Sequence, residues 1–354
     1  VRTLAAELGA RYVLEGSVRK AGSAIRVSAR LIDAQTGTQL WAGTYDRDLQ
    51  ASGIFDVQDD VAARIVATVA DSYGVLVRSM TAVLQQKADP ELSPSEWLFQ
   101  YFAYRQQITP PAHAALKSRL ERAVERDAGK SDLWACLAQV YTDEYAFGFQ
   151  ADPTSLDRAV AAARRAVELD RANQFALVSL AQVYFFRQDL AAFRPAAEQA
   201  MALNRLNTDA LGILGLQIEH TGEFQRGAAI VRRAMELNPN HAGWFHFGPI
   251  WEHFERGEYE RALEHAMQVN MPSMFWQPLV IAAICGQLGR RTEGAAAIRD
   301  LLALDPDFGK HGRRDIGVWH FASGLLDRIL DGVRSAGLDV EVARPPEAPK
   351  KRRY

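Results

Sequence analysis

Hydrophobic and polar residues alternate along positions 12–47, a pattern typical of half-buried β-strands. Ile25, Val27, Ala29 and Leu31 fall on one face of such a strand, with Arg26, Ser28 and Arg30 opposite. Turn-forming sequences at residues 21–23 and 35–37 divide the segment into three strands, so we predict an antiparallel meander. After it the apolar spacing changes to that of a helix that Asp56 caps. The apolar positions of this helix are Val57, Val61, Ile65 and Val69.

From residue 97 onward the apolar spacing is helical and repeats at a longer interval. Leu180 and Leu214 are 34 residues apart, and so are Leu203 and Leu237. This is the period of the tetratricopeptide repeat, a pair of helices that buries its apolar face against the neighbouring pairs. Between residues 141 and 159 the spacing is nine residues longer than in the next repeat, so we place an enlarged turn at 147–153.

These patterns predict a small amino-terminal α+β module followed by an all-α tetratricopeptide-repeat solenoid. We place the module at residues 1–78, a linker at 79–94 and about five helix pairs at 95–307. A capping region follows at 308–338, with an amphipathic helix over 321–336 that would close the open end of the solenoid. Residues 339–354 form a Pro-rich basic tail. Residues 1–8 resemble the end of a helix stopped by Gly9, so we expect the chain to be a piece of a longer protein.

Composition narrows the function only a little. The 354 residues are 48% hydrophobic and 24% charged, with a net charge of −2, as in an ordinary globular protein. A net charge near zero gives no general case for nucleic-acid or membrane binding, and no apolar run is long enough to span a membrane. Lys350, Lys351, Arg352 and Arg353 form the one strongly basic run, which we expect to be a solvated tail and not a membrane or nucleic-acid contact.

The two cysteines, Cys136 and Cys285, lie far apart in apolar helical stretches. Free buried thiols explain them better than a disulfide or a metal pair. The chain begins with Val1, and we expect no signal peptide in it.

Five stretches of the amino-terminal module resemble the second half of the TolB amino-terminal-like domain. They are residues 5–20 (AAELGARYVLEGSVRK), 30–37 (RLIDAQTG), 40–42 (LWA), 45–49 (YDRDL) and 54–59 (IFDVQD). In that family, tetratricopeptide repeats follow the domain, and residues 270–272 and 330–338 are also similar to that arrangement. The resemblance covers nearly the whole chain.

The resemblance implies a partner domain upstream. Proteins of this kind in bacteria carry an amino-terminal output domain, either a class III adenylate/guanylate cyclase or a winged-helix DNA-binding domain. This sequence departs from the pattern because it contains neither the output domain nor the opening strand and helix of the TolB-like domain. We expect a cytoplasmic location by default, and a periplasmic one if a spanning helix lies upstream.

We find no motif for chemistry in the chain. It contains neither a P-loop nor His-Glu-x-x-His, and it contains no pair of metal-binding aspartates like that of a cyclase. Asp59 and Asp60 fall in the first turn of a helix, where acidic residues suit the helix dipole better than a metal role. His246 and His253 would share a helix face, but a metal site needs about three ligands, so ordinary packing is the better explanation. We therefore assign no catalytic residue, metal or cofactor, and we predict that the chain is not an enzyme.

One group of aromatic residues stands out from the scaffold. Trp244, Phe247, Trp251 and Phe254 fall at i, i+3, i+7 and i+10, on one stripe of a helix. In tetratricopeptide repeats these positions line the concave groove, and the same count adds four residues of other repeats, Phe175, Phe185, Phe186 and Trp276. The alternative is that the stripe packs on the adjacent repeat or on the carboxy-terminal tail. Gly248-Pro249 is a weak point of the helix, because proline removes a hydrogen bond.

The sequence thus leads to two functional hypotheses. The first is a sensor or scaffold module of a signalling protein that holds a protein or peptide segment in the concave groove, with aromatic side chains as anchors. The second is that the chain belongs to an adenylate or guanylate cyclase whose catalytic domain lies upstream. The nature of the upstream domain distinguishes the two.

Overall fold

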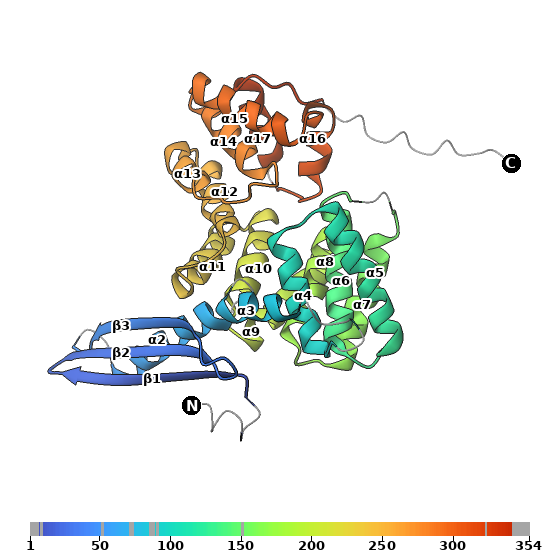
Figure 1. Cartoon of the computed structure of the whole chain (residues 1–354). Helices are drawn as coiled ribbons and strands as arrows, with labels where there is room; N and C mark the ends of the chain where they lie inside the picture. The colour runs from blue at the N-terminus through green and yellow to red at the C-terminus, as the bar shows by residue number, and fades with distance from the viewer. Residues whose placement is uncertain are drawn as a thin grey trace.

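The computed structural model of the chain describes residue 7 and residues 10–50, 53–70, 74–84, 89, 92–149, 152–322 and 324–341 (Figure 1). Three of the sequence predictions fall largely outside these residues. They are the amino-terminal helix end, the centre of the linker and the basic tail.

The amino-terminal module contains an antiparallel sheet of three strands, which confirms the predicted meander. The strands are β1 (Tyr12–Ala21), β2 (Ala24–Asp33) and β3 (Gln39–Asp48), in the spatial order β1-β2-β3. Gly22 has a φ of +61° in the tight turn between β1 and β2, a conformation that glycine adopts without strain.

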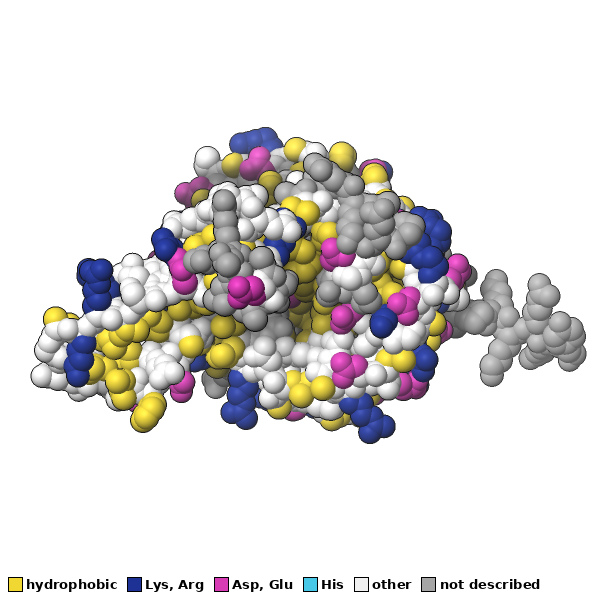
Figure 2. Space-filling model, turned by 60° about the horizontal axis from the view of Figure 1, so that its bottom comes forward, with side chains coloured by type: hydrophobic (Ala, Val, Ile, Leu, Met, Phe, Trp, Pro, Cys, Tyr) yellow, Lys and Arg dark blue, Asp and Glu magenta, His cyan; other side chains and the backbone are white. Residues whose placement is uncertain are grey.

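Helix α2 (Ile54–Ala70) covers one face of this sheet over β2 and β3. Val57 and Val61 pack with Ile25 there, as the helical spacing predicted. The predicted cap is wrong by one turn, because the helix begins at Ile54 and Asp56 lies inside its first turn, accepting a hydrogen bond from the Gly53 N–H. Hydrophobic side chains of the module also show at the surface, at the left of Figure 2. In the module Leu14, Val18 and Phe55 are 50%, 65% and 78% exposed.

The module is joined to the array by packing and by a helix. On the side away from the sheet, Ala63 and Ala67 of α2 pack with Leu211 of the array. Helix α3 (Val75–Leu84) runs through the start of the segment predicted as a linker. Further along that segment, the Asp89 carboxylate lies 2.6 Å from the guanidinium of Arg119.

The described part of the array contains six helix pairs, where the sequence predicted about five. The pairs are α4 (Pro94–Gln106) with α5 (Pro110–Arg126), α6 (Ser131–Ala146) with α7 (Ser155–Leu169), α8 (Gln174–Phe186) with α9 (Leu190–Leu203), α10 (Thr208–His220) with α11 (Phe224–Leu237), α12 (Phe247–Glu255) with α13 (Tyr259–Ala266), and α14 (Trp276–Gln287) with α15 (Arg291–Leu304). A short 3₁₀ turn, η2 (Gly243–His246), precedes α12. The enlarged turn predicted near residue 150 lies between α6 and α7.

Small residues allow the two helices of a pair to approach closely. Ala138 and Ala181 are fully buried at equivalent positions of successive repeats. At the same position of the next repeat, a Cβ on Gly215 would lie 2.8 Å from the side chain of Val231, so no larger residue fits there without movement. Asn173 and Asn207 begin the first helices of two repeats, and each side chain accepts a backbone N–H three residues on.

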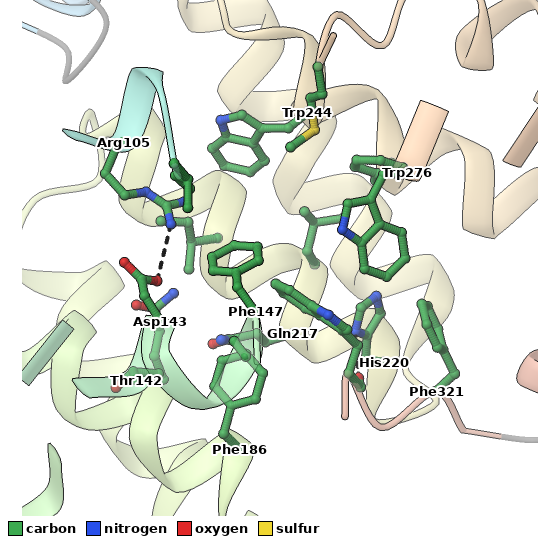
Figure 3. Close-up of a pocket in the computed structure, with 18 of the residues that line it drawn as sticks. Arg105, Thr142, Asp143, Phe147, Phe186, Gln217, His220, Trp244, Trp276 and Phe321 are labelled. Carbon is green, nitrogen blue, oxygen red and sulfur yellow. Dashed lines mark hydrogen bonds and ion pairs between the residues drawn. The ribbon is translucent and has the colours of Figure 1, made fainter. Parts of the chain in front are cut away.

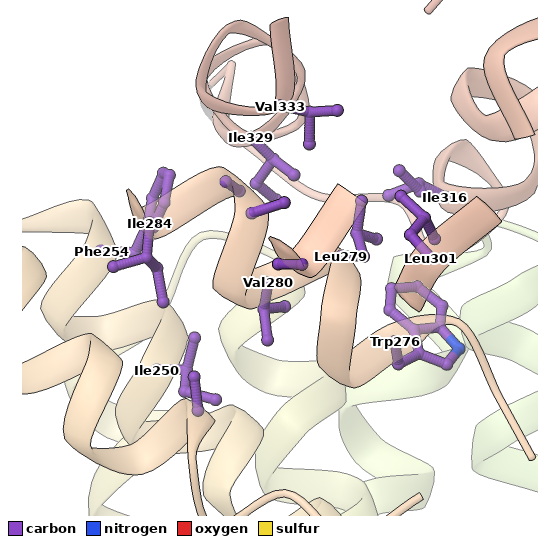
Figure 4. Packing of buried hydrophobic residues seen from close by; sticks show 14 of the residues in the cluster. Ile250, Phe254, Trp276, Leu279, Val280, Ile284, Leu301, Ile316, Ile329 and Val333 are labelled. Carbon is purple, nitrogen blue, oxygen red and sulfur yellow. The ribbon is translucent and has the colours of Figure 1, made fainter. Parts of the chain in front are cut away.

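Two further helices close the carboxy-terminal end of the array. Helix α16 (Phe308–Gly317) is followed by α17 (Leu325–Ser335), which packs along α14 and buries Ile329 and Val333 in the core shown in Figure 4. The predicted helix over 321–336 therefore begins four residues later than expected, at Leu325. Phe321 lies before it, in the connection between α16 and α17.

Candidate functional site

A cavity of about 130 Å³ lies on the concave face of the helical array. Its wall receives residues from α4, α6, α8, α10, α12 and α14, which are the first helices of all six pairs. The second helices, all of which the structure describes, contribute none of its lining residues. In a tetratricopeptide array the first helices form the inner surface, so this cavity is the point at which the inner surfaces of all six repeats meet.

Eight aromatic residues from distant parts of the chain line the wall (Figure 3). They are Phe147, Phe186, Trp244, Phe247, Trp251, Trp276, Trp319 and Phe321. Many meet edge to face, the arrangement that the aromatic quadrupole favours. The ring centroids of Phe186 and Trp319 are 5.3 Å apart, and those of Trp276 and Trp319 are 5.5 Å apart at 87°.

Five of the eight residues predicted for the groove line this cavity. They are Phe186, Trp244, Phe247, Trp251 and Trp276.

The other three predicted residues are not among its lining residues. Phe175 packs with Tyr101 and Phe102 of α4. Phe185 and Phe254 are 1% and 0% exposed and face the second helices of their own pairs, where they meet Phe193 and Tyr259.

The aromatic stripe is both part of the core and part of the cavity wall. Trp251 is only 2% exposed and stacks on Phe247, with ring centroids 5.8 Å apart at 12°. The stripe does not lie on one continuous helix, since Trp244 is in η2 and α12 begins at Phe247. Pro249 is therefore in the first turn of α12, where a backbone N–H has no partner within the helix and proline is tolerated. Trp244, Phe247 and Trp251 thus both pack in the core and line the cavity, which combines the two alternatives that the sequence left open.

Residues 319–322, which we call the strap, cross from the carboxy-terminal helices to the inner surface of α8 and α10. Nδ1 of His220 lies 2.9 Å from the carbonyl oxygen of Trp319, and the Ala322 N–H donates to the His220 carbonyl at 3.0 Å. Nε2 of His320 lies 3.0 Å from the carbonyl oxygen of Phe186. The rings of Trp319 and Phe321 consequently complete the wall of the cavity. Sequence reasoning assigned Phe321 to a helix and assigned no role to Trp319.

The polar part of the wall contains one ion pair and one neutral histidine. Arg105 Nη1 lies 3.3 Å from Asp143 Oδ1, and burial raises the pKa of this aspartate to about 6. Burial lowers the pKa of His220 to about 3, so its ring is neutral at pH 7. Because a carbonyl oxygen can only accept, Nδ1 of His220 carries the proton, and Nε2 has a free lone pair.

Buried polar atoms without a hydrogen-bond partner are concentrated around this cavity. Among the described residues eleven such side-chain atoms occur, and five belong to residues of the cavity wall. They are Asp143 Oδ2, Gln182 Oε1, Gln217 Oε1, His220 Nε2 and Trp244 Nε1. A buried polar atom without a partner costs free energy, and such atoms are uncommon in folded proteins.

The histidines considered for metal binding, His246 and His253, both contact His265. The Nδ1 atoms of His246 and His265 are 2.9 Å apart, and the ring of His253 stacks on that of His265 with centroids 5.8 Å apart. Nδ1 of His253 lies 2.7 Å from the Glu258 carboxylate. Among the described residues these histidines do not form the three-ligand set that a zinc site needs. In α2 the Asp60 carboxylate forms ion pairs with Arg47 and Arg64, so it is not free to bind a metal.

Elsewhere in the described residues, one group has the spacing of metal ligands, namely Asp305, His311 and Asp315. The two imidazole nitrogens of His311 lie 3.3 Å and 2.7 Å from the two carboxylates, so the ring already bridges them.

Both cysteines are free and buried, as predicted, and burial raises the pKa of each thiol. Among the described helices, none combines the length and apolar character needed to cross a bilayer.

No model of a known protein family matches the chain. A protein of Rhizobium meliloti (strain 1021), provisionally named adenylate cyclase 3, is 33% identical over 190 residues. That alignment covers 48% of this chain and 28% of the relative, so the chain spans well under half of that protein's length.

Solved helical-repeat structures resemble the chain in fold. Human IFIT1 with PPP-AAAA has a TM-score of 0.54 at 14% identity, covering 73% of this chain and 68% of that one. The Cut9–Hcn1 assembly also has a TM-score of 0.54, at 13% identity, with 82% and 54% covered. YrrB, a tetratricopeptide-repeat protein, matches at a TM-score of 0.36 and 18% identity, with 53% and 93% covered. The chain folds as an amino-terminal α+β module followed by an all-helical solenoid of tetratricopeptide-like helix pairs.

Proposed function

We propose that this chain is a binding module, without catalytic activity of its own, that holds a segment of a partner protein in the cavity on its concave face. One observation carries the proposal: the first helices of all six pairs meet at a single cavity that combines aromatic walls with buried, unpartnered polar atoms. Apolar walls with a few polar groups are the usual composition of a ligand site.

The module belongs, in this proposal, to a longer bacterial signalling protein in which it senses or gathers a partner. The relative named as an adenylate cyclase supports this context, because the chain matches only 28% of it and leaves room for an output domain. The TolB-like resemblance of residues 5–59 supports the same architecture. The location that goes with it is the cytoplasm, or the periplasm if a spanning helix lies upstream.

A second candidate is that the chain forms part of a nucleotide cyclase whose catalytic domain lies upstream. The same relative favours it, at 33% identity over 190 residues. In that case the module would position or regulate the catalytic domain, and the residues that act on ATP or GTP would lie outside this chain.

A selection of random peptides displayed on phage tests the binding function. We expect the purified chain to enrich peptides that bind it, and we expect Ala146→Phe, which fills the cavity from α6, to weaken their binding at least about 10-fold. Trp244→Ala, which enlarges the cavity, is a second variant in case the first perturbs folding. Met267→Ala is the matched control, because Met267 is 65% exposed and is not part of the cavity wall. Failure to enrich any peptide, or enriched peptides that bind the chain and both cavity variants equally, would overturn the proposal.

A further inference from the structure

The size of the concave cavity limits what part of a ligand can enter it. Its volume is about 130 Å³. A protein cavity of roughly 150 Å³ lined by apolar side chains holds one molecule of benzene. The cavity is therefore close in size to a single ring, which corresponds to one side chain of a bound segment.

The strap shows which chemistry the inner surface already binds. The Trp319 ring lies edge to face against Phe186 and Trp276, and the Phe321 ring lies 5.1 Å from that of Trp251 at 71°. The backbone on either side of these rings is hydrogen-bonded to α10 through His220. The inner surface thus holds an aromatic segment of this same chain by edge-to-face packing together with main-chain hydrogen bonds.

The charges in the wall favour a neutral ligand. Arg105 and Asp143 form an ion pair, so the two opposite charges of the wall balance each other. An ammonium group in the cavity would be repelled by the guanidinium, and a carboxylate would be repelled by the aspartate. The mainly apolar walls would not replace the hydration of either ion.

The unpartnered atoms favour a ligand that donates a hydrogen bond. Asp143 Oδ2 and His220 Nε2 are acceptors, and the amide oxygens of Gln182 and Gln217 add two more. Trp244 Nε1 is the single donor of the group. A ring without an O–H or N–H has no donor to offer these acceptors, whereas a phenol or an indole carries one.

We propose that the cavity takes one neutral aromatic side chain that carries a hydrogen-bond donor, the phenol of tyrosine or the indole of tryptophan, from a partner segment that runs beside the strap. This inference rests on the proposed binding function and names the anchor residue of the ligand.

Three small probes of similar size test the anchor directly: phenol, toluene and benzoate. Each is titrated into the purified chain while chemical shifts or the fluorescence of the wall tryptophans are followed. We expect phenol to bind about 10-fold more tightly than toluene, the factor that one hydrogen bond contributes, and benzoate to bind more weakly than either. Equal or tighter binding of toluene or benzoate would overturn the inference.

Two variants place the probe in the cavity. Gln217→Leu removes one buried acceptor and keeps a similar volume, so the preference for phenol over toluene should shrink severalfold. Its melting temperature should be unchanged or higher, because the leucine leaves no unpartnered oxygen. Ala146→Phe should abolish phenol binding, and phenol binding that persists in this variant would place the probe elsewhere and refute the inference.

The peptide selection separates this inference from the function on which it rests. Enriched peptides that contain tyrosine or tryptophan, and lose about 10-fold or more in affinity when that residue becomes leucine, support both. Peptides that depend on the cavity but contain neither residue would keep the binding function and refute the anchor.

Discussion

Trp251 gives the sharpest test of how the concave face is built, because its ring is at once core and cavity wall. Replacement by alanine removes a ring that is 2% exposed, stacked on Phe247 and in contact with Phe321. A buried aromatic side chain removes roughly 150–250 Å² from water, which at about 25 cal/mol per Å² corresponds to roughly 4–6 kcal/mol as an upper value.

Measured losses for such substitutions are about 3–5 kcal/mol. The space left by the Trp251 ring would join the existing cavity of about 130 Å³, and neighbouring side chains could not move far enough to fill it. We therefore expect Trp251→Ala to lose about 4 kcal/mol of unfolding free energy, near the middle of the measured range. Trp251→Phe, which keeps a ring against Phe247, should lose less than half as much.

Urea-induced unfolding, followed by far-ultraviolet circular dichroism, measures these losses. Phe55→Ala is the matched control, because its ring is 78% exposed and should contribute under about 0.5 kcal/mol. A loss below about 1 kcal/mol for Trp251→Ala would refute the reasoning. It would mean that the stripe forms an open groove that is filled only when a partner binds.

Three other predictions follow from the fold and its ionisable groups. Ala181→Arg should lower the unfolding free energy by several kcal/mol, because a charged side chain would enter a fully buried helix contact, and an unchanged urea midpoint would contradict the repeat register. Stability should fall as pH is lowered from about 6.5 towards 4, because the folded pKa values of His220 and His246 are about 3 and about 4, so the unfolded chain binds protons first. The lowered pKa values of His113, His265 and His320 act in the same direction, whereas the raised pKa values of Asp143 and Glu219 oppose it. Urea titrations at several pH values measure the slope, which should flatten in His246→Gln, and a stability that rises in acid would contradict the assignment. The purified chain should form no cyclic nucleotide from ATP or GTP with Mg²⁺ or Mn²⁺, and cyclic product above background would show a catalytic site within it.

The repeat period and the strand alternation were sufficient to predict the elements of the fold, because both depend on local spacing. Alternation placed the three strands, and the 34-residue interval placed the helix pairs. Small residues such as Ala181 marked the helix contacts, since only they fit where two helices touch. Helix ends were less certain, as at Ile54 and Leu325, because capping depends on single hydrogen bonds and not on periodicity.

The candidate site was predicted only in part, because the sequence does not contain the curvature of the array. Trp244 and Trp251, which periodicity assigned to the groove, line the cavity, but periodicity could not show that Phe254 turns toward its own second helix. The polar members of the wall, such as His220, have no distinctive spacing. Trp319 and Phe321 offered one usable signal, two large aromatic residues in an otherwise irregular connection.

The strap changes how the array should unfold. In an open solenoid each repeat touches only its neighbours, so the ends fray while the middle survives. Here hydrogen bonds join residues 99 and 134 positions apart, and they fasten the last helices to the third and fourth pairs. Detachment of α16, α17 and the strap between them would also remove the rings of Trp319 and Phe321 from the cavity wall, so the carboxy-terminal half cannot unfold without cost to the middle. The repeats should therefore unfold together in one cooperative transition. Because the strap closes a long loop of the chain, it should be one of the last parts to fold.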